Sequence, residues 1–496
     1  MRQPVQLIIV AALISAGLIS NAPAQQPPVF SLAKSGKLPV PTMMHGTAVV
    51  GSRVYIFGGN FEQAPGSGGG WINDVYSAPV QGQGTLGEWR KEEPLPERRA
   101  YIGNAVQVIN NHIYIVGGSV FQAQNSADNG VQSQDVLWTT VGADGKLSTW
   151  QKSQPFPGQS VSNTSTCATD KNLFMLGGHN DQIVSDAVLV CDVGEDGAPV
   201  NWRQAAKLPT PLWFHGSAIL EDRVYVWGGL PTQESKIVSG KVYSAPVGAN
   251  ATIGAWQEEA PLPYPIYSSA FTGFNDYLIG VSGRYVGGLP TNAIWFARLQ
   301  NKKVTAWQFL NTDLQARLYC ALGLDRTKGW VFITGGLDRR TTNLKRGPEA
   351  PVVDLVQAFQ LTQPTETKLV VAQNPQPAAA PAAAPSAAPA NAQVLGLPQA
   401  LQNAAQQNKK VLAFFYSPEV PACKRTWDQL INTPAFTAAT ANVVFSAIDI
   451  SGADASQSYK YGVFKVPSFA LLSPTGELLK KQLKVQTTQD LQQLLQ

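Results

Sequence analysis

Charged side chains are scarce in this chain of 496 residues. Lys, Arg, Asp and Glu together make up only 14% of it, and the formal net charge at pH 7 is +4. Nucleic-acid binding requires a concentrated basic face, and so small and dispersed a charge argues against one. We therefore expect no nucleic-acid partner.

Long apolar stretches are also lacking, apart from one at the N-terminus. Arg2 precedes an apolar run from Val5 to Ile19, and an A-x-A pattern follows at 22–24. A run of about fifteen residues is short for a membrane span, and the pattern is typical of signal-peptide cleavage. We expect residues 1–24 to be a signal peptide cleaved near Ala24, which predicts a periplasmic or secreted bacterial protein without a transmembrane span. The alternative is an uncleaved anchor.

A double glycine recurs along the chain, each time after a short apolar run. It stands at Gly58-Gly59, Gly117-Gly118, Gly177-Gly178, Gly228-Gly229 and Gly335-Gly336, with Ser282-Gly283 in the fifth repeat. A tryptophan recurs almost in step, at Trp89, Trp150, Trp202, Trp256 and Trp307. Self-similarity at about fifty residues with four strands per repeat is typical of a β-propeller, in which we expect each Trp to pack between neighbouring blades.

The sixth repeat lacks a Trp-containing strand after Gln360, and the N-terminus supplies a replacement. Residues 29–41 contain LPVP, which matches the PLPERR and KLPTPLW segments that follow other tryptophans. A strand donated from the N-terminus would close the ring and remove its exposed edges. We therefore predict six blades over residues 28–362.

The double glycine after an apolar strand, with a Trp about thirty residues later, resembles the kelch repeat. The resemblance implies an all-β six-bladed kelch-type propeller, but a propeller fold does not specify an activity. Galactose-oxidase-like kelch enzymes hold copper with two Tyr and two His, and the four His of this chain are too few and too scattered for that. A second kelch enzyme type, the periplasmic N-acetylneuraminate epimerase, handles an anionic sugar and stays open as an alternative.

The composition changes sharply after the propeller. Residues 363–392 are rich in Ala and Pro, which predicts a semi-extended linker. Residues 393–496 then follow a helix–strand–helix–strand–strand–strand–helix order that resembles the α/β thioredoxin fold, with Pro467 at the position of that family's cis-proline. The fold class is therefore multidomain, a propeller followed by a thioredoxin-like domain.

The thioredoxin-like domain carries one cysteine where the family has two. Aligned on Cys423, the family's first cysteine falls on Val420 and its buried acid on Phe414. Dithiol–disulfide exchange needs an attacking and a resolving sulfur. We predict a redox-degenerate domain used for binding or stability. The alternative is a lone Cys423 thiol activated by a helix N-terminus.

The other cysteines and the histidines offer little chemistry. Cys167 and Cys191 fall on the first and third strands of one repeat, about 9.5 Å apart at the usual strand spacing, and a disulfide needs under about 7 Å. Cys320 lies in another repeat, so we expect no disulfide.

His45 and His215 occupy opposite positions of a six-fold ring, too far apart to share an ion. We expect no metal and no cofactor.

Any ligand should lie on the face where the first strand of each repeat enters the channel. Long loops crowd that face, and loops on a rigid scaffold usually carry the binding groups. The candidates are His45, Arg99, Tyr101, Asn163, Trp213, His215, Tyr267 with its neighbour Ser268, Arg317, Tyr319 and Arg339. Such groups suit a protein partner or a glycan, and the arginines also suit the carboxylate of an anionic sugar. We favour an exported binding or scaffolding protein over an enzyme, with an epimerase-like and a monothiol redox role as alternatives.

Overall fold

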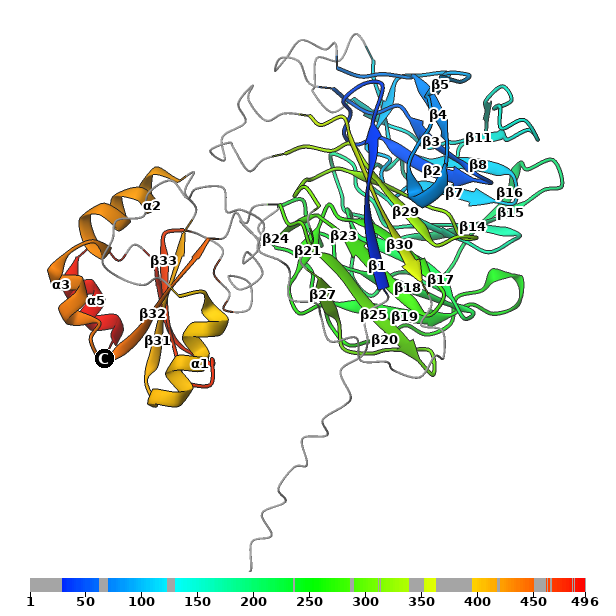
Figure 1. Cartoon of the computed structure of the whole chain (residues 1–496). Helices are drawn as coiled ribbons and strands as arrows, with labels where there is room; N and C mark the ends of the chain where they lie inside the picture. The colour runs from blue at the N-terminus through cyan, green and yellow to red at the C-terminus, as the bar shows by residue number, and fades with distance from the viewer. Residues whose placement is uncertain are drawn as a thin grey trace, which may run out of the picture.

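The structure is a computed structural model, shown in Figure 1. It describes residues 29–61, 70–122, 130–234, 237–285, 290–310, 312, 314–338, 352–362, 395–416, 420–449, 461, 463, 466–483, 485 and 487–495. The predicted signal peptide, the predicted linker and Arg339 lie outside these residues. Within them, no helix combines the length and the apolar character needed to cross a bilayer.

Six antiparallel sheets form the N-terminal domain, and the predicted six-bladed propeller is confirmed. The first blade has β2 (Gly46–Val50), β3 (Arg53–Phe57), β4 (Val75–Pro79) and β5 (Arg90–Lys91). The second has β7 (Val106–Ile109), β8 (His112–Val116), β11 (Val136–Thr140) and β12 (Gln151–Lys152). The third has β13 (Ser165–Ala168), β14 (Asn172–Leu176), β15 (Val188–Val193) and β16 (Pro199–Gln204).

The remaining blades follow the same order. The fourth has β17 (Gly216–Leu220), β18 (Arg223–Trp227), β19 (Val242–Pro246) and β20 (Gln257–Glu258). The fifth has β22 (Ala270–Phe274), β23 (Tyr277–Val281) and β25 (Ile294–Gln300), with β26 (Lys303–Val304) and β27 (Gln308–Leu310) both paired to β25. The sixth has β28 (Ala321–Leu324), β29 (Trp330–Thr334), β30 (Leu355–Thr362) and β1 (Val29–Lys37). Short ladders join β6 (Arg99–Ala100), β9 (Ser119–Val120) and β10 (Val131–Gln132), and β21 (Ile266–Tyr267) with β24 (Arg284–Tyr285).

The N-terminal strand completes the sixth blade. β1 pairs antiparallel with β30 from Val29 opposite Thr362 to Lys37 opposite Leu355. Four of the repeating tryptophans donate their indole N–H to the carbonyl that follows the outer strand of the preceding blade. These bonds join Trp89 to Lys37 (2.7 Å), Trp150 to Glu93 (3.0 Å), Trp256 to Ala206 (3.1 Å) and Trp307 to Ala260 (3.1 Å). The Lys37 carbonyl thus accepts the tryptophan bond that the Glu93 carbonyl accepts in the next blade. This makes β1 the outer strand of the last blade.

The double glycines join the blades to one another. In every blade the N–H of the second position donates to a carbonyl at the entrance of the next blade. The bonds run from Gly59 to Arg99 (2.8 Å), Gly118 to Val161 (3.0 Å), Gly178 to Leu212 (2.8 Å), Gly229 to Ile266 (2.8 Å), Gly283 to Arg317 (3.4 Å) and Gly336 to Thr42 (2.8 Å). A Cβ on the first glycine would meet the same carbonyl, at 2.3 Å for Gly58 and 2.7 Å for Gly228, and both residues have positive φ. Glycine is therefore required by space as well as by backbone conformation.

The C-terminal domain has helices on both faces of a four-stranded sheet. The strand order is β32 (Val443–Asp449), β31 (Lys410–Tyr416), β33 (Ser468–Leu472), β34 (Leu478–Leu483), and only the β31–β32 pair is parallel. Alternate residues of β31 face α1 (Leu397–Gln407) on one side and α3 (Pro434–Ala439) with α5 (Thr488–Leu495) on the other. α2 (Pro421–Thr426) continues as a π turn to Ile431, and the Val466–Pro467 peptide bond before β33 is cis. This arrangement agrees with the predicted thioredoxin-like fold. The helix α3 was not predicted.

Candidate functional site

One residue of each blade adopts a left-handed backbone where the chain enters the innermost strand. These six residues, called the entrance ring below, are Met44, Tyr101, Asn163, Phe214, Ser268 and Tyr319, with φ between 50° and 62°. A left-handed backbone costs a residue with a side chain about 1 kcal/mol or more. Its recurrence at six equivalent positions indicates that the whole ring depends on this turn.

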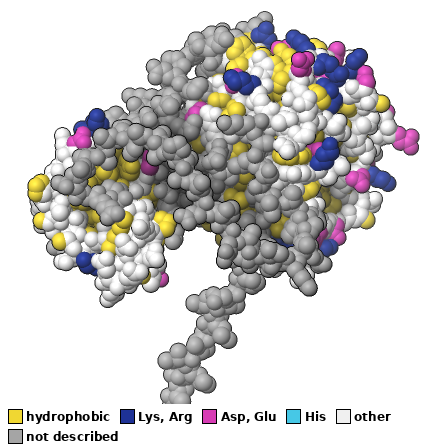
Figure 2. Space-filling model, in the orientation of Figure 1, with side chains coloured by type: hydrophobic (Ala, Val, Ile, Leu, Met, Phe, Trp, Pro, Cys, Tyr) yellow, Lys and Arg dark blue, Asp and Glu magenta, His cyan; other side chains and the backbone are white. Residues whose placement is uncertain are grey.

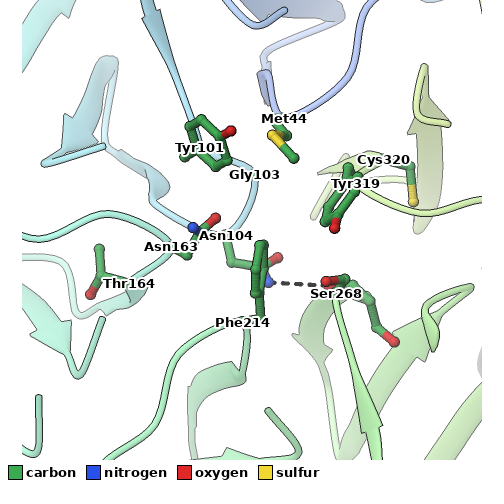
Figure 3. A pocket seen from close by; sticks show the side chains of 11 residues that line it. Met44, Tyr101, Gly103, Asn104, Asn163, Thr164, Phe214, Ser268, Tyr319 and Cys320 are labelled. Carbon is green, nitrogen blue, oxygen red and sulfur yellow. Dashed lines mark hydrogen bonds between the residues drawn. The ribbon is translucent and has the colours of Figure 1, made fainter. Parts of the chain in front are cut away.

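Backbone hydrogen bonds link the entrance ring from blade to blade. The N–H groups of Met44, Asn163, Phe214 and Ser268 donate to the carbonyls of Tyr319 (2.9 Å), Tyr101 (3.2 Å), Asn163 (3.1 Å) and Phe214 (3.3 Å). Ile102 N–H adds a bond of 3.3 Å to the Met44 carbonyl. Because of the left-handed turn, the backbone N–H and C=O groups of these residues bond around the channel to neighbouring blades and not along a sheet. The six side chains lie together at the channel mouth (Figure 3).

All six members of the entrance ring line one small pocket. The other lining residues are Gly103, Asn104, Thr164, Ser269 and Cys320. The pocket has a volume of about 20 Å³, which is room for one water-sized group. Figure 3 shows the rings of Tyr101, Phe214 and Tyr319 around it, and the centroids of the Phe214 and Tyr319 rings are 5.6 Å apart.

Asn104 lies across the channel next to this pocket. Its side-chain Nδ2 belongs to the second blade and donates to the carbonyls of Ser269 (3.1 Å) and His215 (3.3 Å), which enter the fifth and fourth blades. The Asn104 carbonyl accepts from Thr166 N–H at 3.0 Å. The amide therefore ties three blades together across the axis.

A much larger cavity opens at the opposite end of the channel. It has a volume of about 450 Å³ and is lined by the far ends of the innermost strands, from all six blades. Arg326 reaches solvent inside this mouth, where its Nη1 donates to the Gly273 carbonyl at 3.3 Å. The surrounding wall desolvates the guanidinium and lowers the pKa of Arg326. Within the described residues it forms no ion pair.

The structure brings four of the predicted candidates together, namely Tyr101, Asn163, Ser268 and Tyr319. Trp213 lies beside the pocket: its indole N–H donates to the Thr232 carbonyl at 2.8 Å, and its ring centroid is 4.7 Å from that of Phe214. Tyr267 is buried, with the Arg284 guanidinium 6.0 Å from its ring centroid.

His45 and His215 do not face the channel, contrary to prediction. Each follows a left-handed residue, so its side chain turns between blades, with the Cβ of His45 packed against Gly59 and that of His215 against Gly229. Burial, and secondarily the charge of Arg317, lower the pKa of His45 to about 3. Burial alone lowers the pKa of His215 to about 3.

Arg99 and Arg317 are also absent from the channel surface. Each stands two residues before the entrance ring and is fully buried. Each donates Nη1 to the carbonyl of the first glycine of its own blade, Arg99 to Gly117 (2.9 Å) and Arg317 to Gly335 (3.0 Å). Arg99 also pairs with Asp135 at 2.8 Å. These arginines therefore hold the blade entrance in shape and are not available to a ligand.

The sequence did not point to the other lining residues, of which Met44 and Phe214 belong to the entrance ring and Asn104 ties the blades together. The alignment was displaced by one residue at His45 and His215. A small residue stands two positions after each member of the entrance ring, and this pattern could have located the ring in the sequence. These residues are Gly46, Gly103, Ser165, Gly216, Ala270 and Ala321. Asn104 has no counterpart in the other blades, so repeat alignment could not identify it.

His179 supports the entrance ring from behind. Its Nε2 lies 3.2 Å from Asn163 Nδ2 and 3.3 Å from Ser162 Oγ, and its ring centroid is 3.9 Å from that of Trp213. Burial lowers the pKa of His179 to about 4, so the imidazole is neutral near pH 7. A neutral imidazole accepts at one nitrogen, and the Asn163 amide is positioned to donate to it.

The cysteines offer no exposed thiol. All four are free and buried, and Cys423, in the first turn of α2, is 1% exposed. Within the part of the chain that the structure describes, no three His, Cys, Asp or Glu side chains are grouped to hold a metal ion. Figure 2 shows positive and negative side chains intermingled on the visible face of the propeller.

Comparison with known proteins identifies both domains. A family model described as the KLHDC2/KLHL20/DRC7 Kelch-repeats domain matches residues 26–229, and a thioredoxin-like domain model matches residues 397–496. Human kelch-like protein 33 is 28% identical over 143 residues, which cover 29% of this chain and 24% of that protein. Human leucine-zipper-like transcriptional regulator 1 is 24% identical over 224 residues, covering 43% of this chain and 24% of that protein.

One further relative and one solved structure are also similar to this chain. Spermatocyte protein spe-26 of Caenorhabditis elegans is 24% identical over 257 residues, covering 50% of this chain and 40% of that protein. The solved structure titled "Structure of YjhT" is 15% identical with a TM-score of 0.49, covering 65% of this chain and 96% of the other. The chain thus spans about a quarter of the first two relatives' length. It contains a kelch-repeat domain followed by a thioredoxin-like domain.

Proposed function

We propose that this protein is an exported scaffold that binds a protein partner through the entrance-ring face of its propeller. The observation that carries the proposal is the ring itself: six strained residues, one per blade, present their side chains together at one channel mouth. Strain of this kind persists only where the surrounding structure enforces it, and it is concentrated at functional sites. The kelch-repeat domain supports a protein-binding role.

The chemistry of the pocket favours recognition over catalysis. Within the described residues no carboxylate, ammonium, guanidinium or imidazole group lines it. General acid–base catalysis needs a group with a pKa near the working pH. The His179 imidazole behind Asn163 has a pKa of about 4 and is engaged with the Asn163 amide. Burial raises the pKa of Cys320, the only thiol in the described lining.

Aromatic side chains give this face the character of a protein-binding surface. Tyr101, Phe214, Tyr319 and Trp213 lie within or beside the pocket, and Tyr and Trp are enriched among the residues that dominate interface energies. A glycan would also stack on such rings. The pocket's volume of about 20 Å³ is room for one small group, which suits the insertion of a single side-chain head group from a protein partner.

We further propose that the thioredoxin-like domain is redox-degenerate. Phe414, which aligns with the family's buried acid, packs between the rings of Phe469 (4.6 Å) and Tyr416 (5.6 Å). Cys423 has no second cysteine in its domain and is almost fully buried. Buried thiols react slowly with oxidants, which suits a protein exported to an oxidising compartment with unpaired cysteines. The N-terminal sequence pattern supports export.

A photo-crosslinking experiment tests the binding proposal. Benzoylphenylalanine is placed at Phe214 in the pocket or, as the matched control, at Phe271 in the opposite cavity. Irradiation in an exported-protein extract of the source organism should join one partner to position 214 and not to position 271. A partner joined equally at both positions, or only at 271, contradicts the proposal.

The epimerase-like alternative keeps one specific observation in its favour. Arg317 is buried and cannot meet a sugar carboxylate, but Arg326, which forms no ion pair within the described residues, lies in a cavity of about 450 Å³, which is in the usual range for small-molecule sites. If an anionic sugar is the ligand, N-acetylneuraminate should raise the melting temperature of the wild-type chain and leave Arg326→Gln unaffected. Absence of any shift in the wild type removes this alternative.

A further inference from the structure

The orientation of Asn104 fixes which atom it offers to the pocket. Carbonyl oxygens only accept hydrogen bonds, so the Nδ2 group must face the carbonyls of Ser269 and His215. The Asn104 Oδ1 is therefore left as an acceptor. Figure 3 draws the Asn104 side chain among the labelled residues of the pocket, with a hydrogen bond leaving its nitrogen.

His179 fixes the orientation of the Asn163 side-chain amide in a similar way. Because the imidazole is neutral, one of its nitrogens accepts, and the nitrogen within 3.2 Å of Asn163 is Nε2. Asn163 therefore donates Nδ2 to His179 and leaves its own Oδ1 as an acceptor. Figure 3 places that oxygen toward the space between the rings of Tyr101 and Tyr319.

Ser268 supplies a third oxygen without a partner. Its Oγ is buried, and in the described structure no hydrogen-bond partner reaches it. Ser268 lines the same pocket as Asn104 and Asn163. A buried hydroxyl left unpaired is unfavourable, so an external group that pairs with it would be favoured.

The aromatic rings add attraction for positive charge. The faces of the Phe214 and Tyr319 rings carry negative potential, which attracts a cation. An ammonium group has three N–H donors and no acceptor, which matches three oxygen atoms and leaves none of its own groups unpaired. A hydroxyl brings a single donor and a guanidinium brings five, so the three donors of an ammonium group match the three oxygen atoms best.

We propose that the entrance-ring pocket binds the ammonium group of a lysine side chain presented by the partner protein. The apolar stem of the lysine would lie along the aromatic rings while its head group meets Asn104, Asn163 and Ser268. This inference rests on the proposed function, since it names the chemistry with which the partner engages the same face.

Ligand-observed NMR on the full chain tests the inference with three probes. These are Nα-acetyl-lysine methylamide, its Nε-acetylated form, which keeps the stem and loses the charge, and methyl α-glucoside. We expect the free lysine derivative to bind at least ten times more tightly than the acetylated one. Phe214→Leu, which keeps an apolar side chain and removes the ring face, should weaken lysine binding about five-fold, whereas Phe271→Leu in the opposite cavity should not.

Three results would overturn the inference. Equal binding of the two lysine derivatives would show that charge is not recognised. Preferential binding of the glucoside would assign the face to a glycan. Absence of binding by all three probes would leave the pocket as a water site. If crosslinking at position 214 still captures a partner in that last case, the proposed function stands and only its lysine chemistry fails.

Discussion

The double glycine offers the sharpest test of how the blades are joined. Gly228 has φ of +72°, and a Cβ added there would lie 2.7 Å from the Ile266 carbonyl, which accepts the bond from Gly229 at 2.8 Å. Gly51 has φ of +57°, and a Cβ there would meet nothing within 4 Å. Both Gly→Ala variants suffer a left-handed backbone, but only Gly228→Ala also displaces an interblade bond.

The expected losses follow from these two terms. Gly51→Ala should lower the free energy of unfolding by about 1 kcal/mol, the cost of a Cβ in the left-handed region. Gly228→Ala should lower it by about 2–3 kcal/mol, because a net hydrogen bond of about 1 kcal/mol and steric strain are added. Urea unfolding of the full chain, followed by tryptophan fluorescence, measures both. Equal losses in the two variants would refute the interblade argument.

The fifth blade provides the reverse experiment. Ser282 replaces the first glycine with φ of 56°, its buried Oγ has no partner in the described structure, and the adjoining bond from Gly283 to Arg317 is the longest of the six at 3.4 Å. Ser282→Gly stabilises the fold by removing the backbone strain and the unpaired hydroxyl. It also destabilises the fold by about 0.5–1 kcal/mol, because glycine gives the unfolded chain more conformational freedom. We expect a net gain of about 1 kcal/mol in the same assay. A destabilised Ser282→Gly variant would contradict the account.

Three further predictions address buried polar groups. His215 has a pKa of about 3 in the folded chain, so it is neutral there, whereas in the unfolded chain it binds a proton near pH 6.5. The folded chain should therefore keep its stability above pH 6.5. Between pH 6.5 and 3 this group should lower the free energy of unfolding by up to about 1.4 kcal/mol per pH unit. His215→Leu should flatten that slope in urea titrations at several pH values, and an unchanged slope would contradict the assignment. Arg99→Met removes the buried cation beside Asp135 and leaves Lys152, 3.0 Å away, as the carboxylate's remaining cationic contact in the described structure, so it should lower stability by about 3 kcal/mol in thermal melts, whereas a loss near zero would mean that the Arg99–Asp135 pair is not formed. Cys423 should resist iodoacetamide in the native chain and react after denaturation, as followed by intact-mass measurement, whereas rapid native alkylation would revive the monothiol alternative.

Repetition made the fold predictable from the sequence. Each double glycine marks the end of one strand and the contact with the next blade, so the spacing gave the number of blades directly. The missing Trp strand after Gln360 and the LPVP segment pointed to closure by the N-terminus, and β1 pairs with β30. The strand order of the C-terminal domain followed from alternating apolar runs, and α3 was missed because PAFTAA is too short to show helical periodicity.

The site was less predictable because its geometry depends on single-residue offsets. A left-handed residue reverses the direction of the next side chain, so moving the alignment from Phe214 to His215 exchanges a channel residue for one packed between blades. Polar residue type was also misleading. The positive charges of Arg99 and Arg317 led to the prediction that these residues bind a ligand. Their guanidinium groups instead donate hydrogen bonds to buried glycine carbonyls. Neither outcome is readable from composition or spacing.

The affinity of the captured partner for two variants tests the central claim most directly. Tyr319→Asn keeps a residue that tolerates the left-handed backbone, as Asn163 does, and removes one ring of the pocket. Arg326→Gln alters the opposite mouth alone. If the entrance ring is the recognition site, the dissociation constant rises at least ten-fold for Tyr319→Asn and stays unchanged for Arg326→Gln. The opposite ranking would place recognition at the other end of the channel.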